Sequence, residues 1–206
     1  MEYNELPLVK FVQQHRPEEW DDIISFLSLH VSYVSLLIVL LIAYKAVYRK
    51  KIFARRILFR LITALLLSGI LNFLTKIFVA RPRPFAVSPE IVKMSSGGSF
   101  SFPSGHTTEV FVLVFVLWHY AGRWLRALLL VWALFIAYSR VALGVHYPTD
   151  VAGGMALAFL AVRLTDYVLA NWQADKTTFL FLFLFFANFH FLQNKAIIPL
   201  KIDPFF

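Results

Sequence analysis

Long apolar runs recur along the chain and are separated by short polar or charged stretches. A helix that crosses a bilayer needs about 20 mostly apolar residues. Six runs approach that length, at roughly 23–44, 61–80, 106–120, 125–143, 151–170 and 178–192. The third and sixth are short, and the sixth is either a phenylalanine-rich lipid-facing span or an interfacial hairpin. The pattern predicts an all-α integral membrane bundle of six transmembrane helices, built as a single domain over residues 1–206.

Composition supports a membrane protein and narrows its chemistry. The chain is 59% hydrophobic with a mean hydropathy of +0.68, more apolar surface than a soluble domain of this size can bury. The absence of cysteine excludes disulfides and thiolate metal sites. In a soluble protein the formal charge of +8 would suggest nucleic acid. Here the basic residues lie between spans or within a phosphate-binding pattern, so we expect a lipid bilayer around the protein and no nucleic-acid partner.

The loop charges predict how the chain crosses the membrane. Between the first two spans lie seven basic residues and no acidic one: Lys45, Arg49, Lys50, Lys51, Arg55, Arg56 and Arg60. Such a loop is cytoplasmic, whether its charges only orient the protein or also bind anionic headgroups. Residues 1–22, acidic and partly apolar, then lie outside as an expected interfacial helix rather than a signal peptide, because a basic start is missing. The loops at 81–105 and 144–150 also lie outside.

Three polar clusters stand at external ends of the predicted spans. They are Lys76 with Arg81-Pro82-Arg83-Pro84, then Pro103-Ser104-Gly105-His106, and finally Ser139-Arg140 with His146 and Asp150. Ionisable side chains at a membrane boundary are costly and are therefore candidates for function. Guanidinium groups fork onto phosphate oxygens, and an ammonium acts as a point charge. The clusters therefore predict a phosphate site.

Local spacing suggests how each cluster is arranged. If the second span stays helical to residue 83, Lys76 and Arg83 share a face, and Arg81 points toward lipid headgroups. Ser104 and Gly105 open a helix whose free N–H groups suit an anion, with Ser104 acting either as a helix cap or as a phosphate donor.

The third cluster adds a histidine–carboxylate pair. Asp150 follows His146 by four positions and can fix its tautomer, leaving the other imidazole nitrogen free to attack phosphorus. Gly153 and Gly154 would let the fifth span pack closely against its neighbours.

Together these clusters resemble the signature of the type 2 phosphatidic acid phosphatase family, which reads Lys-x6-Arg-Pro, Pro-Ser-Gly-His and Ser-Arg-x5-His-x3-Asp. The resemblance covers about residues 60–165 and implies a six-helix bundle. It implies that Lys76, Arg83 and Arg140, with the backbone N–H groups of Ser104 and Gly105, bind the phosphate. His146 would be the nucleophile that forms a phosphohistidine, Asp150 would orient it, and His106 would protonate the leaving oxygen and then activate water. No metal and no other cofactor is expected.

Glu109 stands outside that signature, three residues after His106 on nearly the same helical face. We expect it either to hydrogen-bond His106 or pair with a catalytic cation, or to hold a purely structural partner.

The predicted function is hydrolysis of a lipid phosphate or diphosphate. Similarity to small bacterial enzymes favours undecaprenyl diphosphate, at a bacterial inner membrane with the active site on the extracytoplasmic face. Lipid A, phosphatidylglycerophosphate or phosphatidate hydrolysis are alternatives, as is phosphotransfer to another lipid. A transporter or scaffold is disfavoured because all three catalytic candidates are present. The sequence does not indicate an oligomeric state.

Overall fold

The computed structural model describes residues 4–95, 97–98 and 100–171. These residues form helices and no strand, which confirms the all-α prediction for them. The helices are α1 (Leu6–Gln14), η1 (Glu18–Trp20, a short 3-10 helix), α2 (Asp21–Leu29), α3 (Val31–Val47), α4 (Ile52–Val79), α5 (Pro84–Val87), α6 (Gly105–Leu117), α7 (Arg123–Ala142) and α8 (Pro148–Asn171). The predicted sixth span at 178–192 lies outside the described residues, so the count of six stays a prediction.

Most of the helix predictions are confirmed. The described helices that are long and apolar enough to cross a bilayer are α4, α7 and α8, and the pair formed by α2 and α3 qualifies as a fourth if it is one span. At 13 residues, α6 is shorter; at ~1.5 Å per residue it covers about 20 Å, less than the ~30 Å hydrocarbon core. The residues before α6 form irregular backbone, which is tolerated at membrane depth only when protein surrounds it.

The expected first span, 23–44, is not one straight helix. It breaks at His30, and its two halves are bent by 46°. The half before the bend, α2, packs on α7, whereas α3 packs on α4 and α6. The two halves therefore follow different partners, which an uninterrupted apolar run does not reveal.

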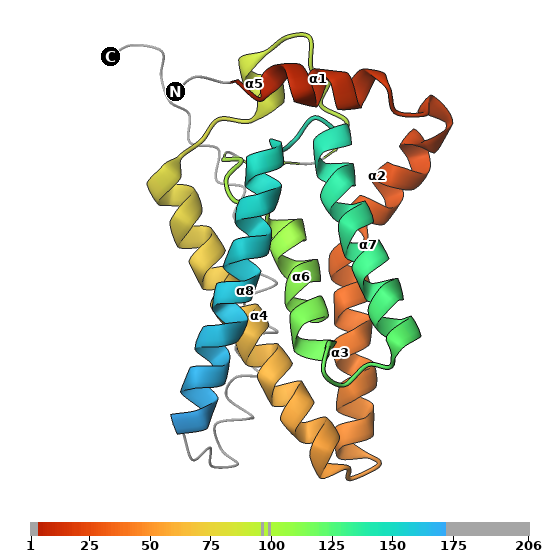
Figure 1. Ribbon diagram of the computed structural model, residues 1–206, viewed down its shortest axis with the longest axis vertical. Helices are drawn as coiled ribbons and strands as arrows, with labels where there is room; N and C mark the ends of the chain where they lie inside the picture. The colour runs from red at the N-terminus through yellow and green to blue at the C-terminus, as the bar shows by residue number, and fades with distance from the viewer. Residues whose placement is uncertain (1–3, 96, 99, 172–206) are drawn as a thin grey trace. The chain divides into compact units, whose positions relative to one another are not determined.

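The short helix α6 lies in the middle of the bundle (Figure 1) and contacts α3, α4, α7 and α8. Eight of its 13 residues are buried, from Thr107 to Val116. A helix that is apolar all round is expected where protein surrounds it on all sides.

Close packing of α8 on the α6 region depends on glycine, as the sequence predicts. A Cβ at Gly153 would lie 2.4 Å from the Phe102 ring. A Cβ at Gly154 would lie 2.7 Å from the carbonyl oxygen of Ser104. Both distances are too short for a real contact, so the start of α8 lies against the start of α6 because these side chains are absent.

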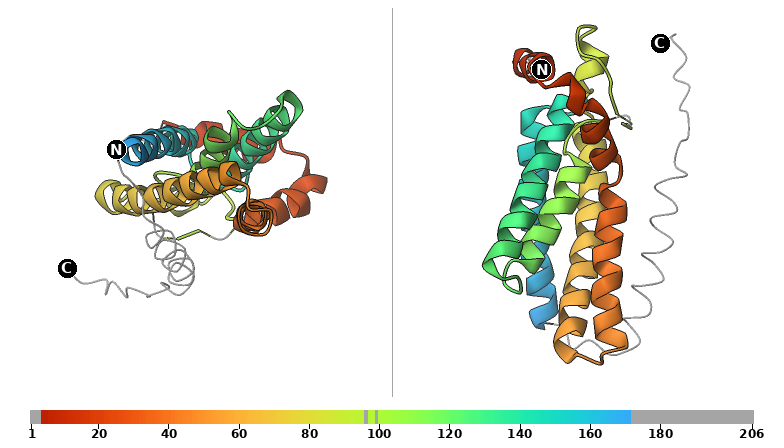
Figure 2. Two further views of the ribbon diagram at one scale, coloured as in Figure 1. Left: turned by 90° about the horizontal axis from the view of Figure 1, so that it is seen from below. Right: turned by 90° about the vertical axis from the view of Figure 1, so that its right-hand side faces the viewer.

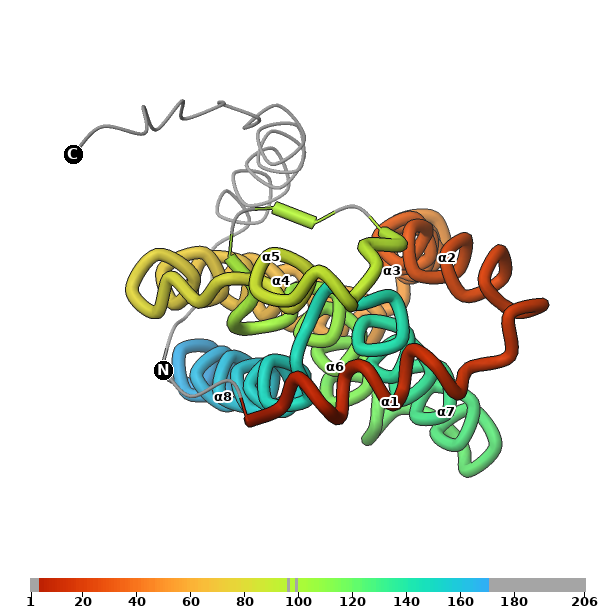
Figure 3. The backbone as a smooth tube through the Cα atoms, turned by 90° about the horizontal axis from the view of Figure 1, so that it is seen from above, coloured from red at the N-terminus to blue at the C-terminus, as the bar shows by residue number. Residues whose placement is uncertain are grey.

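The expected N-terminal helix is present as α1, and it lies across one end of the bundle. Figure 2 shows this helix over the ends of the long helices, and Figure 3 shows it running between α8 and α7. Val9 is fully buried in a cluster with Ile91, Val141 and Tyr147. The buried amide of Gln13 donates to the carbonyl oxygen of Val92 at 2.8 Å, and its oxygen accepts the Val92 N–H at 2.9 Å. This helix is therefore anchored to the protein and covers the end where the predicted phosphate site lies.

Candidate active site

Four helix ends lie at the end of the bundle that α1 crosses. They are the C-terminal ends of α4 and α7 and the N-terminal ends of α6 and α8 (Figure 1). The three sequence clusters lie at these ends, because α4 and α7 run toward α1 whereas α6 and α8 run away from it. Alternating helix direction thus brings residues from distant parts of the chain together.

Arg83 reaches this site through a turn, and not along a helix face as the sequence suggested. The α4 helix ends at Val79, and Ala80 takes a left-handed conformation with φ 47°. The Arg83 guanidinium, 5% exposed, donates from Nε to the carbonyl oxygen of Gly98 at 2.7 Å and from Nη1 to that of Val145 at 2.8 Å. These carbonyl partners fix the guanidinium without neutralising its charge.

Lys76 stays on α4 and points to the segment before α6. Its ammonium donates to the carbonyl oxygens of Pro103 at 2.7 Å and Phe100 at 3.2 Å. The lysine therefore lies beside the Pro-Ser-Gly-His turn, as a joint phosphate site requires.

Arg140 is the most buried of the three cations, at 1% exposed near the end of α7. Its Nη1 donates to the hydroxyl of Ser28 and, at 3.3 Å, to that of Ser95. Neither serine was predicted from the sequence. Ser28 is inside an apolar run and Ser95 is 45 positions from Arg140, so no local pattern marks them.

His146 lies at the centre of these cations and is 2% exposed. Its Nε2 is 3.3 Å from Nη1 of Arg83, and its Nδ1 is 3.5 Å from Oδ2 of Asp150. A guanidinium can only donate, so this contact assigns the proton to Nδ1, facing Asp150, and the lone pair to Nε2. Burial, followed by the positive charges of Arg83 and Arg140, holds the pKa of His146 well below 6.5. The imidazole is therefore neutral near pH 7, the state that a nucleophile needs.

The carboxylate of Asp150 is fully buried in the first turn of α8. Its Oδ2, which faces His146, also accepts the Tyr147 N–H at 2.8 Å. Asp150 is thus placed to orient the imidazole, as the spacing of four positions predicts.

The Pro-Ser-Gly-His turn lies where expected, with one difference. Ser104 occupies the N-cap position of α6, but its side chain makes no capping hydrogen bond. Its backbone N–H donates to the carbonyl oxygen of Asp150 at 2.9 Å, so this amide joins α6 to α8. The first-turn amides from Gly105 onward lack partners within the helix and point the positive end of the dipole at the site.

His106, in that turn, interacts electrostatically with Arg140, His146, Arg83 and Lys76.

Glu109 lies one turn further along α6. Its Oε2 accepts a hydrogen bond from the Ser32 hydroxyl of α3 at 2.9 Å. The contact ties α6 to α3, and an effect of Glu109 on His106 stays a prediction.

The expectation that Arg81 faces lipid headgroups is wrong. Its guanidinium lies 3.8 Å from the centre of the Tyr147 ring and donates to Asp150 Oδ1 at 2.8 Å and to Glu5 Oε1 at 2.8 Å. The helix ends before Arg81, so counting 100° per residue from Arg83 does not apply.

Residues 57–174, more than half of the chain, match the family model described as the PAP2 superfamily. The chain belongs to the PAP2 superfamily. Membership confirms the resemblance read from the three motifs. Given its candidate spans, this PAP2 chain is a multi-pass membrane protein.

Relatives of this PAP2 chain include proteins named for different lipids. YbjG of Escherichia coli (strain K12), provisionally named an undecaprenyl-diphosphatase, is 32% identical over 122 residues, covering 58% of this chain and 59% of YbjG. The lipid A 4'-phosphatase of Bacteroides thetaiotaomicron is 36% identical over 101 residues, covering 45% of this chain and 43% of that protein. The matched stretches thus span about half the length of these relatives.

A solved structure shares the fold. The crystal structure of LpxE from Aquifex aeolicus aligns with a TM-score of 0.68 and 26% identity, covering 78% of this chain and 93% of LpxE.

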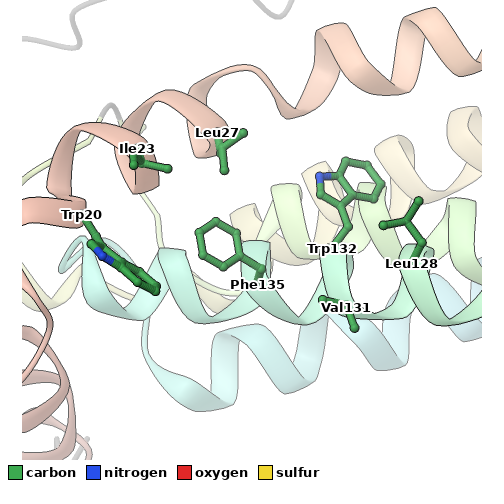
Figure 4. A pocket seen from close by; sticks show the side chains of 7 residues that line it. All are labelled: Trp20, Ile23, Leu27, Leu128, Val131, Trp132 and Phe135. Carbon is green, nitrogen blue, oxygen red and sulfur yellow. The ribbon is translucent and has the colours of Figure 1, made fainter.

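Beside the polar site, this PAP2 chain carries an apolar groove of about 380 Å³ between α2 and α7, with η1 at one end. Figure 4 shows its lining side chains: Trp20, Ile23, Leu27, Leu128, Val131, Trp132 and Phe135. Phe135 also packs on the buried cluster of Ile24, Leu143 and Val145. The hydrogen bond from Arg140 of α7 to Ser28 of α2 joins the same two helices that line the groove.

Proposed function

We propose that this protein is a lipid phosphatase that hydrolyses a lipid phosphate or diphosphate through a phosphohistidine on His146. The observation that carries the proposal is a buried imidazole whose Nε2 lies 3.3 Å from the Arg83 guanidinium while Asp150 lies 3.5 Å from its Nδ1. Fixed cations that are already desolvated can stabilise the charge of a transferring phosphoryl group without reorganising.

The proposed reaction has two steps. In the first, Nε2 of His146 attacks phosphorus in line, the bond to the leaving oxygen breaks, and His106 supplies the proton that this oxygen takes up. In the second, His106 takes a proton from water, the resulting hydroxide attacks phosphorus, and the N–P bond breaks. Asp150 stabilises the positive charge on His146 throughout, while Lys76, Arg83 and Arg140 hold the phosphoryl oxygens.

Undecaprenyl diphosphate is the preferred substrate within this class. Relatives named for this lipid and for lipid A support a membrane lipid bearing phosphate, and the apolar groove offers a surface that suits a hydrocarbon chain. Lipid A, phosphatidylglycerophosphate and phosphatidate are the alternatives, because the site groups recognise phosphate and not the tail.

We place the active site on the extracytoplasmic face of a bacterial inner membrane. The basic residues between α3 and α4 lie at the end of the bundle opposite α1 (Figure 1), and the positive-inside rule puts that end in the cytoplasm. The end that carries His146 then faces outward.

Phosphate release from undecaprenyl diphosphate, lipid A, phosphatidylglycerophosphate and phosphatidate, measured with purified protein and a chelator, tests this proposal. We expect hydrolysis to persist with chelator and to be fastest on undecaprenyl diphosphate. In ¹⁸O-labelled water, hydrolysis releases free phosphate that carries the label, whereas phosphotransfer puts the phosphoryl group on an acceptor lipid, without label and without release of phosphate. The absence of turnover on all four lipids would contradict a lipid phosphatase.

A further inference from the structure

Glu5, the residue before α1, and Arg81, the first arginine of the Arg-Pro-Arg-Pro segment, extend the contacts of the His146–Asp150 pair. Glu5 accepts from Nη2 of Arg81 at 2.8 Å, and from the Thr149 N–H at 2.8 Å and the Thr149 hydroxyl at 2.6 Å. Nη1 of Arg81 donates to Oδ1 of Asp150 at 2.8 Å. Burial raises the pKa of Glu5, but hydrogen bonds from Thr149 and Arg81 outweigh it and leave the pKa below its usual value. Glu5 is therefore ionised when it holds this arginine.

These contacts divide the two oxygens of the Asp150 carboxylate between two tasks. Oδ1 is held by Arg81, whereas Oδ2 accepts the Tyr147 N–H and faces His146 Nδ1. Tyr147 also supports the Arg81 guanidinium from below, at 3.8 Å. The carboxylate cannot rotate without breaking the Arg81 contact, so Arg81 fixes the oxygen that orients the nucleophile.

The charges of Glu5, Arg81 and Asp150 matter as well as the positions of these groups. Arg81 alone would neutralise Asp150 and weaken the negative field that stabilises a positive His146. The carboxylate of Glu5 offsets Arg81, because it lies as close to this guanidinium as Asp150 does. The three groups together keep one net negative charge behind the imidazole.

We infer that Arg81 and Glu5 are positioning residues for the proposed phosphotransfer: Arg81 fixes the Asp150 carboxylate, and Glu5, delivered by α1, keeps that carboxylate effective as the counter-ion of His146. The inference rests on the proposed function and extends it, since neither residue belongs to the signature motifs. It also assigns α1 a role in the site that it covers.

The test compares variants whose charge changes have opposite signs. The charged or titratable groups that face His146 are Arg83 and Lys76 from α4 and the segment after it, His106 from α6, Arg140 from α7 and Asp150 from α8. All of them remain in every variant. Arg81→Met removes a positive charge, so the pKa of His146 should rise; Glu5→Gln removes a negative charge, so it should fall. A merely structural loss would not move the two in opposite directions.

We expect the acid limb of kcat/KM to move to higher pH in Arg81→Met and to lower pH in Glu5→Gln, each by about one pH unit or less. The kcat should fall roughly 100-fold in Arg81→Met and less in Glu5→Gln, with KM little changed, because substrate contacts remain. Arg81→Lys keeps the charge but loses the planar guanidinium, so the acid limb of kcat/KM should stay in place while kcat falls.

Glu90→Gln is the matched control. Glu90 pairs with Lys10 of α1 at 2.5 Å, so this substitution also removes a carboxylate that ties α1 to the protein, but away from Asp150. We expect wild-type kcat and an unmoved acid limb. If Glu90→Gln reproduces Glu5→Gln, or if the limbs of Glu5→Gln and Arg81→Met move in the same direction, the inference is overturned.

Titration of the His146 imidazole by NMR in the same variants, assigned by its loss in His146→Gln, separates this inference from the proposed function. If the wild-type protein is inactive but the His146 pKa shifts in opposite directions in the two variants, the effect of Glu5 and Arg81 on His146 is supported and the phosphatase is rejected. If the wild-type protein is active but the shifts are not opposite, the phosphatase is supported and the roles of Glu5 and Arg81 are rejected.

Discussion

The two ends of the bundle carry the same basic residue types in opposite surroundings. Arg49 and Lys50 between α3 and α4, and Arg55 and Arg56 near the start of α4, are exposed. At the other end Arg83 and Arg140 are 5% and 1% exposed and are held by carbonyl and hydroxyl groups. Water stabilises an exposed cation, which leaves it weakly selective, whereas a buried cation on neutral dipoles is poised for an anion. Burial, and not charge count, separates the end that we expect to orient the protein from the end that we propose binds phosphate.

Arg60 shows a third arrangement, intermediate between these two. It lies within α4 and pairs with Asp166 of α8 at 2.6 and 2.8 Å, joining the two helices. Its charge is already neutralised by a carboxylate, so we expect it to contribute to packing. The type of group that an arginine contacts therefore indicates the role of that arginine as much as its burial does.

Replacing the proposed nucleophile should have the largest effect on activity. His146→Ala is expected to lower kcat at least about 1000-fold, because the reaction loses its covalent intermediate. His119→Ala, at the exposed opposite end, should keep wild-type turnover. Phosphate release and thermal unfolding in detergent measure both variants, and substantial activity in folded His146→Ala would refute the assignment.

Removing one cation from each end sharpens the contrast. Arg83→Met should lower kcat/KM by roughly 100- to 1000-fold, since one preorganised donor to the phosphoryl group is lost. Arg56→Met removes the same charge where it is solvated and should leave kcat/KM unchanged. Steady-state rates on one lipid suffice, and equal losses in the two variants would contradict a special role for the buried end.

A smaller loss of activity is expected when the glycine beside the Arg83 guanidinium, Gly97, is replaced by alanine. A Cβ at Gly97 would lie 2.9 Å from the guanidinium, so Gly97→Ala should displace it and lower kcat/KM about 10-fold. Among the described residues, none places an atom within 4 Å of a Cβ at Gly122, which precedes α7 at the other end. Gly122→Ala should therefore be neutral in the same assay, and an unaffected Gly97→Ala would show that the guanidinium is not held from this side.

The sequence predicted the helices and the residues of the site better than their partners. Apolar runs located α4, α7 and α8, and motif spacing singled out Arg83, Arg140 and His146, whose roles stay predictions. The pairing of Arg140 with Ser28 spans 112 positions, and that of Arg81 with Glu5 spans 76. Such contacts depend on how helices pack, and no periodicity encodes them. The bend at His30 was not predicted for the same reason, because α2 and α3 pack against different helices.

The smallest predicted effect concerns pH. Burial and the surrounding cations lower the pKa of His146, so lowering the pH to 6.5 should leave its imidazole neutral in the free protein. Because the unfolded chain takes up this proton first, the folded state should lose stability only as pH falls below 6.5. An NMR titration of the imidazole measures the shift, and half-protonation at or above pH 6.5 would contradict the electrostatic contrast between the two ends.

Trapping the phosphoenzyme tests the central claim most directly. Protein quenched during turnover of ³²P-labelled lipid, with the label on the transferred phosphoryl group, should carry an acid-labile, alkali-stable phosphoryl group on the peptide that contains His146. His146→Asn should carry none. Label on another residue, or turnover without any labelled protein, would contradict the phosphohistidine.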